Sequence, residues 1–109
     1  MPTIDERYDE AIRVQQQGDM EGALDRLQTL AKEEPNYALA HAALSVFYSK
    51  QEKYDEAIAH AQKVCELEPQ DPFSFIALSL VCQKAGKVME AEQALWQARQ
   101  AQTSARYGG

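Results

Sequence analysis

The sequence contains little of what enzymes, metal proteins and disulfide-stabilised scaffolds require. Its only cysteines, Cys65 and Cys82, lack the C-x-x-C spacing of zinc and redox sites, and two are too few for a disulfide framework. His41 and His60 are the only histidines; His60 has Glu56 one turn earlier, but two ligands do not complete a metal site. No glycine-rich phosphate loop, nucleophile elbow or paired-carboxylate arrangement occurs. We therefore expect no enzymatic activity, no metal and no cofactor, and we interpret both cysteines as small buried apolar residues.

Basic charge and long apolar runs are also scarce. The 109 residues include 11 basic and 17 acidic side chains, for a net charge of −6, whereas phosphate backbones and anionic lipids require a basic surface. Apolar runs such as 80–82 are far shorter than the roughly 20 residues that cross a bilayer. The first residues have neither the positive start nor the apolar stretch of a secretory signal. We expect no nucleic-acid partner, no membrane insertion and a cytoplasmic location.

What the sequence does contain is an internal period of 34 residues without insertion. It is visible in three columns of equivalent positions: Ala23, Ala57 and Ala91; Gly18, Glu52 and Gly86; and Pro35, Pro69 and Thr103. The period divides one domain, 1–109, into repeats 4–37, 38–71 and 72–105, followed by a tail, 106–109, that we expect to be flexible. We interpret Gly108 and Gly109 as part of that tail rather than as the end of a protein modifier.

Each repeat has the pattern of two helices joined by a short turn. Ala57, Ala61 and Val64 recur at helical spacing, and turn residues occupy 17–19, 51–53 and 85–87. Proline disfavours the helical conformation in the residue before it, so Pro35 and Pro69 are expected to end the second helices. The alanine column allows two connected helices to approach closely. The sequence therefore predicts an all-α solenoid of three antiparallel helix pairs.

The repeats resemble the tetratricopeptide repeat family over residues 4 to about 105. The first repeat departs from the family pattern at Arg7 and Glu10, and the third has Thr103 in the proline column. The middle repeat matches the pattern best, with Leu44, Ser45, Tyr48, Tyr54, Ala57 and Pro69. The resemblance implies a superhelix without chemistry of its own, which binds another protein along a concave surface lined by the first helix of each repeat.

The inward columns of those first helices predict a mostly apolar groove. Its residues are Asp5, Tyr8, Asp9, Ile12, Leu39, Ala42, Ala43, Val46, Lys50, Phe73, Ile76, Ala77, Leu80 and Lys84. We expect a peptide or helical segment with two or three apolar anchors, and with a basic residue toward Asp5 and Asp9. In the alternative interpretation, neighbouring helices bury this stripe. Core positions are predicted separately, at Leu44, Phe47, Tyr48, Leu78, Val81 and Cys82.

One subfamily of these repeats grips the C-terminal carboxylates of chaperone tails with Lys, Asn and Arg in the same columns. This chain has other residues there, namely Tyr8, Ile12, Ala43, Phe73 and Ala77. A carboxylate needs charge-assisted donors. The sequence therefore argues against that co-chaperone role.

The two ends of the array differ from its middle. Charged residues crowd one side of the first helix, as the polar outer face of a terminal repeat requires. The last helix carries Met89 and Trp96 seven residues apart on its outer side, where they are either partly shielded or in contact with another protein. The second possibility supports an alternative function, a homodimer or larger scaffold that associates through the groove or this helix.

Overall fold

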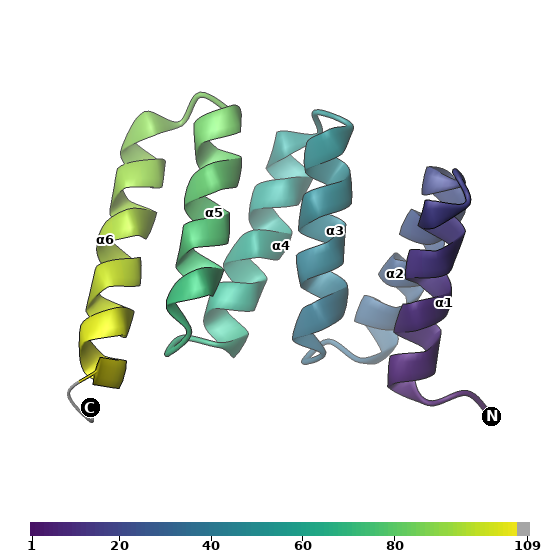
Figure 1. Cartoon of the computed structure of the whole chain (residues 1–109). Coiled ribbons are helices and arrows are strands. Elements are labelled where there is room, and N and C mark those ends of the chain that lie inside the picture. Colours follow the sequence, from purple (N-terminus) through teal and green to yellow (C-terminus); the bar gives the residue numbers. More distant parts are fainter. Residues whose placement is uncertain (107–109) are drawn as a thin grey trace.

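The computed structural model of the chain describes the backbone of residues 1–106 and the side chains of residues 1–104. This part of the chain contains helices and turns but no strand. Its helices are α1 (Ile4–Gln16), α2 (Met20–Glu33), α3 (Ala38–Lys50), α4 (Tyr54–Leu67), α5 (Pro72–Lys84) and α6 (Val88–Arg106). Equivalent helices begin 34 residues apart, and three antiparallel pairs stand side by side in chain order (Figure 1). The predicted all-α solenoid is confirmed.

The turn within each pair is a Schellman motif, in which two amides beyond the helix reach back to its last carbonyls. In the first turn Gly18 N–H donates to Gln15 O at 2.9 Å and Asp19 N–H to Val14 O at 3.1 Å, and the same bonds recur in the other two turns. The residue at the centre has a positive φ: 96° at Gly18, 59° at Glu52 and 79° at Gly86. Glu52 therefore adopts a conformation that favours glycine.

Proline ends the second helices of the first two pairs, as predicted. Glu34 and Glu68, the residues before Pro35 and Pro69, leave the helical conformation, with ψ of 73° and 64°. The third repeat has Thr103 in this column, and α6 continues through it to Arg106. The helix thus includes the first residue of the predicted tail, whereas 107–109, including the Gly-Gly pair, lie outside the described residues.

Small residues allow the two helices of each pair to approach closely. Ala23 and Ala57 are completely buried and Ala91 is 2% exposed, and all three belong to one core. The predicted core positions in α3 and α5 are buried around them: Leu44, Phe47, Tyr48, Leu78, Val81 and Cys82. One continuous core therefore runs through the array and leaves the opposite sides of α3 and α5 available.

Candidate protein-binding groove

Helices α3, α4 and α5 line a cleft with a volume of about 240 Å³, which we call the α3–α5 cleft. Six residues of the predicted groove line it in two matching rows: Ala42, Val46 and Lys50 from α3, and Ala77, Leu80 and Lys84 from α5. The two rows are equivalent or nearly equivalent positions of adjacent repeats. The period of the sequence thus places them side by side.

The apolar residues on this side of α3 and α5 are exposed rather than covered by neighbouring helices. Val46 is 51% exposed and Leu80 is 54% exposed, while Leu44 and Leu78 on the opposite sides of the same helices are buried. Both helices are apolar nearly all round, but only one side of each contributes to the core. The other side is left for a second molecule to cover.

Other predicted groove residues lie outside this cleft. Leu39, Phe73 and Ile76 are exposed but do not line it. Ala43 differs from the expectation, because it is 8% exposed and belongs to the core cluster, where its small side chain packs within the array. It contributes little surface to a partner.

The four predicted residues of α1, Asp5, Tyr8, Asp9 and Ile12, also lie outside the α3–α5 cleft. The hydroxyl of Tyr37, just before α3, donates a hydrogen bond of 2.6 Å to a carboxylate oxygen of Asp5. The ring of Tyr37 packs edge-on against Tyr8, with 6.1 Å between ring centroids. Burial, followed by the bond to Asp5, raises the pKa of Tyr37, so the hydroxyl remains a donor. Asp5 is therefore already engaged within the chain.

The sequence analysis missed part of the cleft lining, including residues of α4. Ala61 and Val64 come from the second helix of the middle pair, whereas the prediction considered first helices only. Their spacing of three, one helical turn, was the available signal. Ser49 also lines the cleft; this serine is 8% exposed, and its Oγ is buried without a hydrogen-bond partner in the described part of the chain.

Lys50 and Lys84 make one end of the cleft positive. Both lie in the last turn of their helices, where a cation also interacts favourably with the helix dipole. The ammonium group of Lys50 lies 5.7 Å from the centroid of the Phe47 ring. A carboxylate at this end of the cleft would have the two lysine side chains as neighbours.

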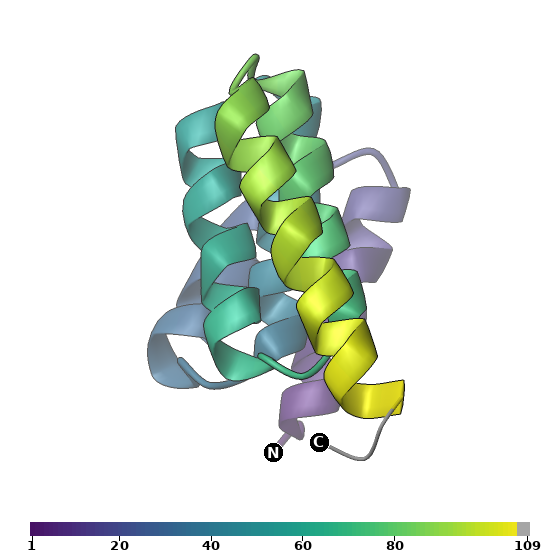
Figure 2. The ribbon, with the colours of Figure 1, turned by 90° about the vertical axis from the view of Figure 1, so that its left-hand side faces the viewer.

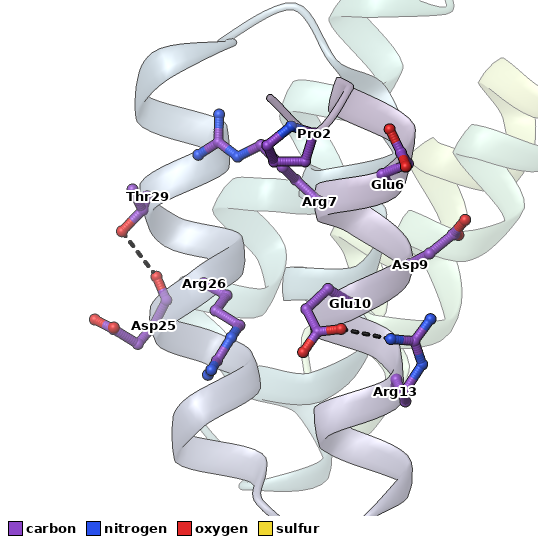
Figure 3. Close-up of a pocket in the computed structure, with 9 residues that line it drawn as sticks. All are labelled: Pro2, Glu6, Arg7, Asp9, Glu10, Arg13, Asp25, Arg26 and Thr29. Carbon is purple, nitrogen blue, oxygen red and sulfur yellow. Dashed lines mark hydrogen bonds and ion pairs between the residues drawn. The ribbon is translucent and has the colours of Figure 1, made fainter.

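A second, larger hollow of about 550 Å³ lies on the outer side of α1 and α2 (Figure 3). It is lined mainly by charged residues of both signs, several of which pair within the chain: Arg13 with Glu10, and Arg7 with Glu33 at 2.9 Å. This is the N-terminal end of the stack. Glu6, Glu10 and Arg13 are charged here. The equivalent residues of the next repeat, Ala40, Leu44 and Phe47, are buried.

The described residues show neither a metal cluster nor a membrane span. No three His, Cys, Asp or Glu side chains among them are grouped as metal ligands. No helix in the same part of the chain has both the length and the apolar character needed to cross a bilayer.

Comparison with solved structures identifies the same fold in other proteins. Two crystal structures of MamA share 21% and 19% identity with this chain, each with a TM-score of 0.85 over 96% of it. The chain spans 58% and 61% of those two proteins. The second tetratricopeptide repeat domain of Spaghetti (RPAP3), solved with the HSP90 peptide SRMEEVD, matches at 20% identity and a TM-score of 0.77, covering 90% of this chain and 91% of that one.

A search of curated protein sequences found no match. A family model for the tetratricopeptide repeat matches residues 15–73, more than half of the chain, and the six helices correspond to about three repeats. This match includes the whole middle repeat, in which the sequence pattern is most complete. The chain belongs to the tetratricopeptide repeat family, whose members are generally modules of protein–protein interaction.

Proposed function

We propose that this protein is a non-catalytic adaptor that binds a segment of a partner protein in the α3–α5 cleft. The observation that carries the proposal is the pair of half-exposed apolar side chains, Val46 and Leu80, facing a common cleft next to Lys50 and Lys84. Covering the exposed half of one such side chain contributes roughly half of the 1.5–3 kcal/mol of complete burial. Two or three anchors therefore contribute a few kcal/mol, to which the charged end of the cleft has to add.

The lining also specifies the chemistry of that segment. An aliphatic or aromatic side chain fits between Val46 and Leu80, and a carboxylate one or two residues further along reaches Lys50 and Lys84. Only a segment that extends past the cleft to α1 would meet Asp9 and Asp5, and Tyr37 already donates a hydrogen bond to Asp5.

The solved relative with a peptide supports this type of function but not its details. The second repeat domain of RPAP3 binds an HSP90 peptide, and this chain has the same fold. In the columns that hold a terminal carboxylate in the chaperone-binding subfamily, however, this chain has no cation. The ammonium groups lie at the other ends of the helices, at Lys50 and Lys84, so we propose a different mode of binding.

Selection from a displayed peptide library tests the proposal, since the partner itself is not needed. The enriched peptides are expected to contain an apolar residue followed closely by an acidic one. Binding of a fluorescent synthetic copy, followed by anisotropy, should weaken about tenfold or more for Val46→Glu and for Leu80→Glu. Ala59→Glu is the control, because Ala59 is exposed and belongs neither to the cleft nor to α6.

Equal binding by all three variants would show that the cleft is not the site. Enrichment of peptides without an apolar residue would contradict the anchor model. Circular dichroism of each variant checks that the helices are intact, so that a loss of binding is not a loss of folding.

The proposal includes a cytoplasmic location and no enzymatic activity. The thiols of Cys65 and Cys82 are free and buried, and burial raises the pKa of both, so neither is a reactive thiolate. Unpaired thiols are typical of reducing compartments.

A further inference from the structure

The C-terminal end of the stack carries an exposed apolar face. Helix α6 forms this end, and Figure 2 views it directly. Val88, Met89 and Trp96 are 61%, 79% and 59% exposed. At about 100° per residue they lie within an arc of roughly 100° on one side of the helix, together with Glu92 and Arg99.

The equivalent positions in α2 and α4 show that this face is not prepared for another repeat. Met89 and Trp96 occupy columns that are polar and exposed in the other two repeats, at Glu21 and Asp55 and at Gln28 and Gln62. Glu92 and Arg99 occupy columns that are buried there, at Leu24 and Ile58 and at Ala31 and Cys65. A repeat stacked in the usual way would bury two charges and leave the exposed tryptophan uncovered.

The opposite end of the stack also excludes a head-to-tail arrangement. There Glu6, Glu10 and Arg13 occupy the columns by which α3 and α5 pack on the preceding pair. Seating α6 of one copy on α1 of another would remove these charges from water, which costs several kcal/mol per ion unless each is well paired. An end-to-end association through the exposed face of α6 must therefore join two identical faces.

We propose that two copies of this chain associate through α6, with the two helices antiparallel about a two-fold axis between Leu95 and Trp96. Glu92 and Arg99 are equally far from that axis, so each Glu92 faces Arg99 of the other copy and two ion pairs form. The two Trp96 rings meet near the axis. Met89 of each copy lies against the C-terminal half of α6 in the other copy. A parallel pair would instead place like charges opposite each other.

The charges on the exposed face of α6 favour a second copy of the chain as the binding partner. The ion pairs within the described part of the chain involve other residues, so Glu92 and Arg99 are free to pair across the interface. They are two helical turns apart, roughly 10.5 Å along the axis. An interface related by a two-fold axis must be self-complementary, and this helix face meets that condition.

Sedimentation and light scattering of the full chain provide the first test. The expected mass is that of two chains, falling to one on dilution. Trp96 is the only tryptophan, so its fluorescence should shift to longer wavelength over the same dilution range as the ring becomes exposed to water. A one-chain mass at every concentration, or a mass that grows without limit, would overturn the proposal.

Charge exchange provides the second test. Glu92→Arg and Arg99→Glu each place like charges in contact twice, so each variant should weaken the dimer roughly tenfold or more. The double variant restores opposite charges and should return to within about threefold of the original dissociation constant. Single variants that dimerise normally, or a double variant as weak as the singles, would contradict the antiparallel arrangement. Both exchanges are at exposed positions, and circular dichroism checks that each variant is folded.

Discussion

The Nδ1 atoms of His41 and His60 lie 3.1 Å apart, joining α3 to α4. The other ring nitrogen of His41, Nε2, is 3.0 Å from the carbonyl oxygen of Pro35 and must donate to it. His41 Nδ1 is therefore the acceptor, and the proton between the rings belongs to His60. This assignment holds when both rings are neutral.

Acidification is expected to destabilise the fold through this pair. Burial, and then the neighbouring His41, lower the pKa of His60 below its ordinary value of 6.5, while Glu56 acts in the opposite direction. A group with a lowered pKa that folds as the neutral base stabilises the protein above its unfolded pKa, and this contribution is lost as the pH falls through the folded pKa. Urea unfolding between pH 7.5 and about 5 measures it.

His60→Gln is the control for that measurement, because it removes the titrating ring and keeps a polar side chain. The free energy of unfolding of this variant should depend less on pH in that interval than that of the original chain. Identical pH profiles would show that the pair does not sense protons.

Replacing Glu52 by glycine should stabilise the protein by about 0.5–1 kcal/mol. Glu52 has a φ of 59° at the position where the other two turns have glycine. The left-handed conformation costs a non-glycine residue roughly 1–2 kcal/mol, part of which is offset by the greater freedom of glycine in the unfolded chain. Gly86→Ala is the opposite experiment and should destabilise the protein by a similar amount in urea unfolding.

Enlarging the alanine column should destabilise the array. Ala57 is completely buried, and its carbonyl accepts a 2.8 Å hydrogen bond from the Ser45 hydroxyl, so Ala57→Leu forces α3 and α4 apart. The expected loss is about 1–3 kcal/mol. Ala59→Leu is the matched control on the exposed side of the same helix and should change stability by less than about 0.5 kcal/mol. Equal effects of the two changes in thermal or urea unfolding would contradict the packing argument.

Reversing the charges at the end of the cleft should reverse its preference for peptides. Two peptides that differ only in Asp or Lys beside the apolar anchor are compared by anisotropy. The original chain is expected to prefer the acidic peptide roughly two- to fivefold, which is the range for exposed ion pairs. The Lys50→Glu, Lys84→Glu double variant is expected to prefer the basic peptide. The preference should weaken as salt is added. No change of preference would mean that the carboxylate binds elsewhere.

The period of the sequence was sufficient to predict the turns within the pairs and the ends of α2 and α4, because the residues at 18, 35, 52, 69 and 86 act locally on the backbone. It also predicted that Val46 and Leu80 lie outside the core, since apolar residues on both sides of a helix exceed what one core can cover. It was less informative where side chains of different helices meet. Three features depend on how the helix pairs are rotated against each other. They are the cleft lining at Ala61 and Val64, the hydrogen bond from Tyr37 to Asp5 and the burial of Ala43. That rotation is set by packing rather than by the spacing of residues.

The charged N-terminal end has a consequence for building longer arrays from this chain. A repeat fused upstream of Thr3 would meet the charged residues Glu6, Glu10 and Arg13 where its own helices need apolar partners. The added repeat should therefore be tethered to the array without packing on it. Exchanging these residues for alanine, leucine and phenylalanine, as at Ala40, Leu44 and Phe47, would give the added repeat an apolar surface on which to pack. Three side chains thus prevent a further repeat from packing on the N-terminal end of this array.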